Sequence, residues 1–321
     1  MSGGAESESA LFRFSEEVRD ALDHELPVVA LESNVVAHGF KAPENIDVAH
    51  AVEQAVRAGG AVPATIAIVD RQVLIGTSED DLLRLATGTA AAKVTSRDIA
   101  VALARPTLGA TSISATMALA HRAGITTVAS AGLGGVHRGA ETSMDISSDL
   151  TELARTDLIV VCAGVKKILD AGRTLEFLET QATPVIGYRH LPFPAFYCRE
   201  SGHDTQVRID DPREVADIAR LHRRFAGSGS ILVTTPIPTE SALDSAEIEA
   251  AIQQALAEAQ EQGITGPKVT TFVLRAVDAA TGGAAAAANR AVLISTARAA
   301  ADIEVARAHS ADPARGALDA V

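Results

Sequence analysis

The sequence predicts an α/β fold in three α/β/α layers, with a central mixed, largely parallel sheet in a single domain. Short apolar runs rich in Val and Ile alternate with longer amphipathic runs along most of the chain. This alternation is typical of helices packed on both faces of a sheet. No composition break, Pro/Ser-rich linker or internal repeat marks a domain boundary. A chain of 321 residues folding as one unit buries about three quarters of its unfolded surface.

Local signals set the ends of the predicted elements. The first long helix has Pro43 and Glu44 in its first turn and Gly59-Gly60 after its last turn. Ser78, with Asp81 three residues later, resembles a capping box. The predicted strands are Leu26–Leu31, Ala64–Val69, Gln72–Ile75, Ala91–Thr95, Ile125–Ser130, Leu158–Cys162, Pro184–Gly187 and Ser230–Thr234. The predicted helices are Pro43–Ala58, Glu79–Ala86, Arg97–Ala104, Thr111–Ala123, Val165–Gln181, Pro212–Phe225, Ser245–Gln262, Thr270–Ala280 and Ala285–Ala308.

The two ends of the chain differ from the rest. Residues 1–15 begin with an acidic stretch that lacks the basic and apolar regions of a signal peptide, and we expect a flexible lead there. Residues 309–321 show no periodicity and are expected to be a disordered tail. Residues 16–308 remain as the folded, catalytic domain.

Composition excludes several classes of protein. A net charge of −13 without a Lys/Arg-rich block argues against nucleic-acid binding. Aromatic residues make up 3% and Trp is absent, which argues against a stacking groove. The sequence contains no run of 18 apolar residues, so no membrane-spanning helix is expected. The two cysteines cannot form a disulfide scaffold, so the protein is expected in the reducing cytoplasm.

Parallel sheets bind ligands at the carboxyl ends of their strands, so chemistry is expected in the loops that follow. Glu32 follows the first predicted strand. It is either a general acid or base, because partial burial raises a carboxyl pKa, or the cap of the next segment.

A cationic stretch joins a predicted strand to a helix. Lys93, Thr95, Ser96 and Arg97 combine two positive charges with two hydroxyls. Beside the N-terminus of a helix these groups suit an anion. The alternative is an ordinary N-cap made by Thr95 or Ser96.

The loop over 132–139 is the most glycine-dense of the chain and places His137 and Arg138 at its tip. It matches neither the dinucleotide fingerprint nor a P-loop. Asp145 and Asp149 follow, interleaved with hydroxyls. Two carboxylates four residues apart suit Mg²⁺ or Mn²⁺, with waters completing the shell. The alternative is a helix N-cap box formed by Asp149 and Glu152.

Lys166 follows a predicted strand and opens a predicted helix. The positive end of the helix dipole would disfavour its ammonium form, and a neutral amine can attack a carbonyl to form a Schiff base. The alternative is an exposed i,i+4 pair between Lys166 and Asp170. Asn289, two turns into the last helix, offers a donor and an acceptor to a polar heterocycle or is a surface residue. Cys162 ends a buried strand and is expected to be structural.

Several of these segments resemble one family. The resemblance runs from about residue 16 to about residue 305. The matching segments are Ala30–Ser33, Ala37–Gly39, Gly60–Ile66, Gly134–Glu141, Asp145–Asp149, Val161–Lys166, Phe193–Phe196 and Thr281–Gly283. The chain is thereby identified as resembling the pseudouridine 5′-phosphate glycosidases, also called the indigoidine synthase A-like family.

The resemblance implies a trimeric three-layer α/β/α enzyme. Such an enzyme reversibly cleaves the C–C glycosidic bond of pseudouridine 5′-phosphate to give uracil and ribose 5-phosphate. It implies that Lys166 forms an imine with C1′ of the ring-opened ribose, that Glu32 is the acid/base and that Asp149 holds Mn²⁺ largely through waters. His137 is expected to be catalytic together with Lys166 and Glu32, and it matches a family position at the sugar phosphate and base. The expected substrate-binding residues are Lys93, Thr95, Ser96, Arg97, Ser112, Ser130 and Asn289. Lys93, Arg97, His137 and Lys166 would then form a local positive pocket within an acidic protein.

Some ligand-facing loops depart from the family pattern. Leu108 replaces an Asn, Ser130-Ala131 replaces Thr-Gly, and Ala284–Ala286 replaces Lys-Ser-Leu. These departures favour an alternative, a C-glycosynthase that joins ribose 5-phosphate to an aromatic acceptor other than uracil. A more remote alternative is a non-catalytic sugar-phosphate-binding protein.

Overall fold

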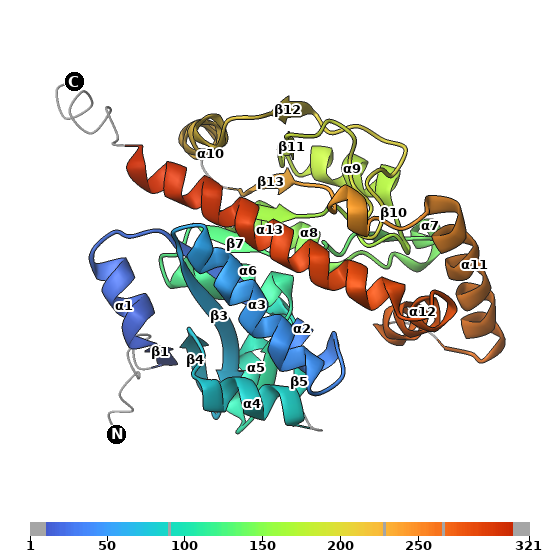
Figure 1. Ribbon diagram of the computed structural model, residues 1–321, viewed down its shortest axis with the longest axis horizontal. Helices are drawn as coiled ribbons and strands as arrows, with labels where there is room; N and C mark the ends of the chain where they lie inside the picture. The colour runs from blue at the N-terminus through green and yellow to red at the C-terminus, as the bar shows by residue number, and fades with distance from the viewer. Residues whose placement is uncertain (1–10, 89–90, 227–228, 265–266, 311–321) are drawn as a thin grey trace.

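The computed structural model describes residues 11–88, 91–226, 229–264 and 267–310. It shows the predicted α/β fold, with one sheet of 11 strands between layers of helices (Figure 1). Its strands are β1 (Phe12–Phe14), β2 (Val28–Glu32), β3 (Val62–Val69), β4 (Gln72–Ile75), β5 (Ala92–Val94), β6 (Leu108–Thr111), β7 (Thr127–Ala129), β9 (Ile159–Cys162), β11 (Val185–Tyr188), β12 (Val207–Ile209) and β13 (Ile231–Thr234). A separate antiparallel ribbon pairs β8 (Val136–His137) with β10 (Leu169–Asp170).

The strand order is β1-β4-β3-β2-β7-β9-β13-β11-β12. All neighbours from β3 to β12 along this path are parallel. The antiparallel pairs of this sheet lie at one end, where β3 meets β4 and β6. The carboxyl ends of β2, β7, β9 and β13 therefore lie along one edge of the sheet.

The helices of the described chain are α1 (Glu16–Asp23), α2 (Asn34–His38), α3 (Glu44–Ala58), α4 (Glu79–Thr87), α5 (Ile99–Ala104), α6 (Ile113–Arg122), α7 (Ala140–Ser143), α8 (Ser148–Arg155), α9 (Ala171–Thr180), α10 (Pro212–Ala226), α11 (Ser245–Glu261), α12 (Pro267–Ala280) and α13 (Ala284–His309).

The helices form two outer layers. The connections from β2 to β3 and from β12 to β13 run in one direction across the sheet, and those from β7 to β9 and from β9 to β11 run in the opposite direction. Because such crossovers are right-handed, α3 and α10 lie on one face of the sheet, and α8 and α9 lie on the other. The C-terminal α13 packs on α3 and α10, and α6 packs on α8.

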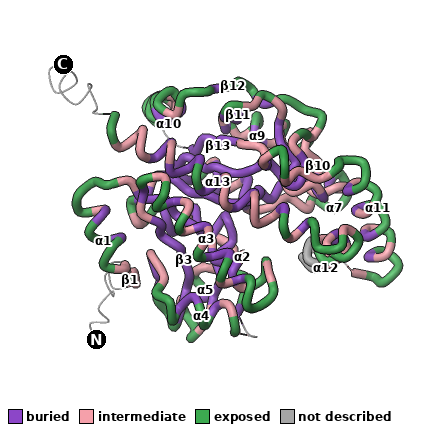
Figure 2. The backbone as a smooth tube through the Cα atoms, viewed as in Figure 1, coloured by how far each residue is buried: buried purple, intermediate pink, exposed green. Residues whose placement is uncertain are grey.

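The core lies at the centre of the sheet and along the inner side of α13 (Figure 2). All four residues of β9 and all four of β13 are buried. Strands buried on both faces read as continuous apolar runs rather than as alternating ones, which is why the sequence shows them so clearly. Within the described ranges, no helix is long and apolar enough to cross a membrane.

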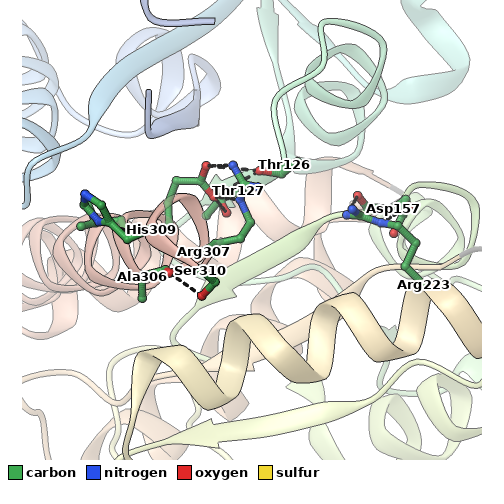
Figure 3. A network of polar contacts seen from close by, with 10 residues as sticks. Thr126, Thr127, Asp157, Arg223, Ala306, Arg307, His309 and Ser310 are labelled. Atoms are coloured by element: carbon green, nitrogen blue, oxygen red, sulfur yellow. Dashed lines mark hydrogen bonds and ion pairs between the residues drawn. The ribbon is translucent and has the colours of Figure 1, made fainter. Parts of the chain in front are cut away.

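A buried acidic side chain fastens the C-terminal half of α13 to the sheet. Glu304 is 1% exposed, and its carboxylate accepts two hydrogen bonds from Arg307, at 2.7 and 2.8 Å. The hydroxyl of Thr127 donates to the same carboxylate at 2.6 Å, and that of Thr126 at 3.1 Å (Figure 3). The two threonine bonds fix α13 against the start of β7, and the two Arg307 bonds, within α13, balance the charge of the Glu304 carboxylate.

Several predictions are wrong at the ends of elements. The flexible lead ends before residue 11, because β1 pairs with β4 and Ser15 caps α1; residues 1–10 lie outside the described residues. The helix predicted from Val165 begins only at Ala171, because the chain first forms the β10 ribbon. Thr111 ends a strand instead of opening a helix, since β6 pairs with β3. Of the predicted tail, His309 still belongs to α13, and residues 311–321 lie outside the described residues.

The Glu304 network gives a stability prediction. Glu304→Gln removes a buried negative charge and leaves Arg307, which is 35% exposed, without its bidentate partner. We expect a loss of about 2 kcal/mol in the free energy of unfolding and a fall in Tm of several degrees. The matched control is Arg298→Ala on the same helix, whose ion pair with Asp302 is half exposed and stabilises by about 0.5 kcal/mol or less. Equal effects in the two variants, measured by thermal and urea unfolding, would contradict the role given to Glu304.

Candidate active site

Five charged side chains converge at the carboxyl edge of the sheet. Glu32 ends β2, Lys93 lies on β5, His137 lies on β8, Asp149 is in the first turn of α8, and Lys166 follows β9. The charges of Lys166, Asp149 and Lys93 all act on Glu32, and those of Lys166 and Lys93 act on His137. The fold thus confirms the prediction that these loops lie together at one edge of the sheet.

Lys166 lies in a loop held by backbone hydrogen bonds. Its N–H donates to the Leu133 carbonyl at 3.1 Å, and the Leu133 N–H donates to the Gly164 carbonyl at 2.8 Å. Gly164 has φ +67°, a conformation that favours glycine. The expected position at a helix N-terminus is wrong, because α9 begins at Ala171, five residues after Lys166. Asp170 is used elsewhere, because it accepts from the N–H of Arg173 at 2.9 Å as the cap of α9.

Glu32 is buried and hydrogen-bonded at the end of its strand. The Ser130 hydroxyl donates to Oε1 of Glu32 at 2.5 Å. Burial raises the pKa of the Glu32 carboxyl, and this outweighs the opposing effects of Lys166 and of the Ser130 hydrogen bond. The alternative in which Glu32 caps the next helix finds no support, since Ser33 is the N-cap of α2.

The two basic groups next to Lys166 are shifted toward their neutral forms. Removal from water lowers the pKa of Lys93, and repulsion by Lys166 lowers it further. Burial likewise lowers the pKa of His137, although Asp145, with Oδ2 3.8 Å from Nδ1, opposes the shift. Burial and the crowding of positive charge thus both favour the neutral forms of Lys93 and His137.

Asp149 connects two loops of the site through backbone amides. Its Oδ1 accepts from the N–H of Ser114 at 3.0 Å, and its Oδ2 accepts from the N–H of Gly134 at 2.9 Å. A Cβ on Gly134 would lie only 2.7 Å from Oδ2, so glycine is required there. The N-cap box suggested for Asp149 is wrong, because Ser147 caps α8 by accepting from the Asp149 N–H.

The acidic groups fit a metal ion only in a limited way. No three His, Cys, Asp or Glu side chains among the described residues form a group that would hold a cation. Asp149 is 6% exposed, and each of its oxygens already accepts one N–H. This environment suits a cation that keeps most of its own water shell, and not one held in a protein cage.

Hydroxyl groups cluster beside Lys93. Ser112 Oγ lies 3.1 Å from Ser114 Oγ, which lies 3.0 Å from Ser148 Oγ. The N–H of Ser96 donates to Ser114 Oγ at 3.3 Å, and the N–H of Ser112 donates to the carbonyl of Val94, the residue after Lys93. The first residues of α6 and α8 therefore meet at a group of hydroxyls, an arrangement that suits an anion.

Two residues of the predicted cationic stretch have other partners. The Thr95 hydroxyl donates to Asp98 at 2.6 Å in a capping box, so the N-cap alternative is confirmed for Thr95. The Arg97 side chain is 81% exposed and lies 3.4 Å from the Asp98 carboxylate. Neither is brought to the charged cluster in this chain.

Sequence reasoning missed Ser114 and Ser148, which join the hydroxyl group only once α6 and α8 pack together. The available signal was weak, because a serine at the start of a helix is most often only a cap. Asn289 lies in α13, and its buried Oδ1 has no hydrogen-bond partner within the part of the chain that the structure describes. An unpaired amide oxygen of this kind is suited to receive a ligand donor.

The fold and this site define an α/β enzyme with a lysine–glutamate centre at the carboxyl edge of its sheet. Residues 17–306 match the family model described as indigoidine synthase A like protein. The chain belongs to this family, as the sequence predicted. It is 50% identical over 281 residues to a pseudouridine-5′-phosphate glycosidase of Serratia proteamaculans, covering 88% of this chain and 91% of that one. It is also 50% identical over 295 residues to pseudouridine-5′-phosphate glycosidase 1 of Photorhabdus laumondii, covering 92% and 93%.

Two solved structures share the fold. One is the prealnumycin C-glycosynthase AlnA in complex with ribulose 5-phosphate, with a TM-score of 0.87 and 40% identity over 93% of this chain and 97% of that one. The other is an indigoidine synthase A-like protein of Thermotoga maritima, with a TM-score of 0.83 and 32% identity over 92% and 96%. The chain is thus similar both to glycosidases and to a C-glycosynthase.

The raised pKa of Glu32 predicts a pH-dependent cost in stability. Between the unfolded and folded pKa values the folded protein binds more protons than the unfolded chain, so stability falls as the pH rises through this window. Glu32→Gln has no carboxyl to ionise. We expect this variant to have a higher Tm than the wild type at pH 7.5, with the difference shrinking as the pH falls toward about 4. Thermal unfolding across this range tests the sign, and a less stable variant at pH 7.5 would refute it.

Proposed function

We propose that this enzyme makes and breaks the C–C bond between C1′ of ribose 5-phosphate and a carbon nucleophile, with pseudouridine 5′-phosphate as the default substrate. One observation carries the proposal: the amine of Lys166 lies close enough to the buried carboxyl of Glu32 for its charge to act on that carboxyl. The pseudouridine-5′-phosphate glycosidases at 50% identity support this substrate.

The chemistry needs an amine and a proton carrier. In the cleavage direction, the neutral amine of Lys166 attacks C1′, the C1′–O4′ bond breaks, and O4′ takes a proton. The nitrogen of the adduct loses a proton and so regains its lone pair. The C1′–C5 bond then breaks: C5 of uracil takes a proton, and the nitrogen lone pair forms a protonated imine. Water hydrolyses the imine to ribose 5-phosphate. Glu32 is assigned to the proton transfers, since its raised pKa favours the protonated form.

The remaining polar groups are assigned to binding. The hydroxyl cluster of Ser112, Ser114 and Ser148 also receives the N–H of Ser96, and this arrangement suits the 5′-phosphate; Lys93 is assigned to the same phosphate by its charge. His137 is assigned to the sugar phosphate, and Asn289 to the base through its unpaired amide oxygen. Ser130 holds the Glu32 carboxyl. We also propose a homotrimer that acts in the cytoplasm, which the family resemblance supports.

A second candidate function is C-glycoside synthesis with an aromatic acceptor other than uracil. The similarity to the C-glycosynthase AlnA favours it, together with the altered loops at Leu108, Ser130 and Ala284–Ala286. The amine and acid chemistry is the same, run in the direction of bond formation. A non-catalytic sugar-phosphate-binding protein is disfavoured because such a protein has no need of a buried acid beside a lysine.

We propose in addition that Asp149 holds Mn²⁺, or alternatively Mg²⁺, through water molecules. A single carboxylate whose oxygens already accept backbone N–H groups supports only this hydrated mode. When bound, the ion supplies positive charge that stabilises negative charge on substrate oxygens. The assignments of Lys166 and Glu32 do not depend on it.

The Lys166 assignment is tested by trapping. Wild-type protein incubated with Mn²⁺ and pseudouridine 5′-phosphate is expected to release uracil, and borohydride in the presence of ribose 5-phosphate is expected to add a reduced sugar phosphate to Lys166. Lys166→Ala should lose both, with activity down by about a thousandfold or more. The matched control is Lys167→Ala, because the Lys167 ammonium instead donates to Ser245 Oγ at 3.0 Å. Trapping without uracil release would favour the C-glycosynthase, and full activity of Lys166→Ala would refute the imine.

The metal assignment is tested by direct binding. Metal-free wild type is expected to reduce the electron paramagnetic resonance signal of free Mn²⁺ and to lose activity until Mn²⁺ is restored. Asp149→Asn should weaken this binding, with thermal unfolding used to check that the variant is folded. The control is Asp145→Asn, since Asp145 is the other carboxylate of the pair in the sequence. Loss of Mn²⁺ binding in the Asp145 variant alone would show that Asp149 is not the ligand.

A further inference from the structure

Arg138 has no role in the proposed function, although its sequence places it at the tip of the glycine-dense loop, directly after His137. Its Nη1 and Nη2 donate to the two carboxylate oxygens of Glu249 at 2.6 and 3.0 Å. Nη2 also donates to the backbone carbonyl of Lys167 at 3.0 Å. One side chain therefore joins three segments: the loop after β8, the segment after β9 and helix α11 (Figure 1).

The Lys167 carbonyl belongs to the turn that carries Lys166. Within this turn the Leu169 N–H donates to the Lys166 carbonyl at 2.9 Å. Leu169 then pairs with His137 in the ribbon of β8 and β10. Arg138 thus bonds to the backbone one residue beyond Lys166, and the ribbon that holds His137 ends the same turn. A shift of the turn would move the lysine relative to the histidine.

Packing alone does not hold this turn in place. A cavity of about 280 Å³ borders it, and its lining includes Val165, Lys167, Leu169, Arg138 and Glu249. Protein interiors are otherwise filled to the density of organic crystals, so a segment beside a cavity has room to shift. The position of the turn consequently depends on the hydrogen bonds to its backbone.

The pair of Arg138 and Glu249 supplies direction more than stability. The two side chains are 30% and 37% exposed, and ion pairs this exposed stabilise a fold only slightly. A bidentate pair between a guanidinium and a carboxylate does, however, fix the orientation of the guanidinium. The hydrogen bond from Arg138 lowers the pKa of Glu249 to about 2, so the carboxylate stays charged at neutral pH. The guanidinium is thereby aimed at the Lys167 carbonyl.

From these contacts we infer that Arg138 is a positioning residue: held by Glu249, it fixes the turn that presents the Lys166 amine to the substrate. The inference rests on the proposed function, because it takes Lys166 as the reacting amine. Arg138 acts through the Lys167 carbonyl, whereas the phosphate is assigned to the hydroxyl cluster. Loss of Arg138 should therefore slow the reaction of the lysine without weakening the binding of the sugar phosphate.

A kinetic test separates positioning from binding. Trapping with ribose 5-phosphate in excess borohydride gives two values for Lys166: the rate at saturating sugar phosphate and the concentration that gives half of this rate. Arg138→Ala is expected to lower the saturating rate by about tenfold to a hundredfold, the effect of a displacement of about 1 Å. The half-maximal concentration is expected to stay within twofold of wild type. An unchanged saturating rate, or a change in the half-maximal concentration alone, would overturn the inference.

A double-variant comparison tests the part played by Glu249. Glu249→Ala should lower the same rate, and adding it to Arg138→Ala should cause no further loss, because the carboxylate acts through the guanidinium. The matched control is Arg173→Ala. Arg173 forms an ion pair with Glu141 that joins α7 to α9 beside the same ribbon, with no hydrogen bond to the Lys166 turn in the described part of the chain. Effects that multiply in the double variant, or an equal loss in the control, would contradict the assigned role.

Two measurements without turnover distinguish positioning from a purely structural role. The Tm of Arg138→Ala is expected to fall by no more than about 3 degrees, since the pair is partly exposed. Amide hydrogen exchange over residues 166–169 is expected to become faster in this variant and to stay unchanged in Arg173→Ala. A large fall in Tm, with normal trapping by the protein that remains folded, would show that Arg138 is only structural.

The wild-type protein separates this inference from the proposed function. If ribose 5-phosphate is trapped on wild-type Lys166 and Arg138→Ala behaves identically, only the role of Arg138 is wrong. If the wild type itself is not trapped, the proposed function fails, and hydrogen exchange over residues 166–169 still decides whether Arg138 holds the turn.

Discussion

The site depends on one buried carboxylate that joins segments far apart in the sequence. Asp149 accepts the N–H of Ser114 at the start of α6 and that of Gly134 in the glycine-rich loop. The preceding residue, Leu133, exchanges backbone hydrogen bonds with the loop that carries Lys166. The position of the lysine is therefore set by a chain of contacts that begins at Asp149. Charge-assisted hydrogen bonds to backbone N–H groups are among the stronger polar contacts, which suits them to this purpose.

The second constraint is the crowding of charge at the edge of the sheet. Glu32 is buried and its pKa is raised, while the pKa values of Lys93 and His137 are lowered. In each case removal from water is the largest cause, and it favours the neutral form of the group. A carboxyl with a raised pKa is suited to act as a general acid, and an imidazole with a lowered pKa as a general base. The acidic surface of the protein does not prevent this, because local burial and not net charge sets these pKa values.

Elements buried on both faces were predictable from the sequence, and those made by long-range pairing were not. Strands β9 and β13 read as continuous apolar runs and were found within one residue of their observed bounds. The strand β6 was missed, since Leu108–Thr111 has no strand pattern of its own and forms only by pairing with β3 and β5. The helix expected from Val165 was wrong for the same reason, because the ribbon of β8 and β10 takes the first residues.

The candidate site likewise combines features that the sequence predicted with features that depend on long-range contacts. The sequence alone determined the fold class, the family and the edge of the sheet at which the candidate site lies, because apolar periodicity and short motifs are local properties of the chain. Only the tertiary structure decided that Arg97 faces solvent, that Ser114 and Ser148 join the hydroxyl cluster, and that the amide oxygen of Asn34 has no hydrogen-bond partner among the described residues. Hydrogen-bond partners and burial depend on residues dozens of positions away, so no local pattern could have assigned them.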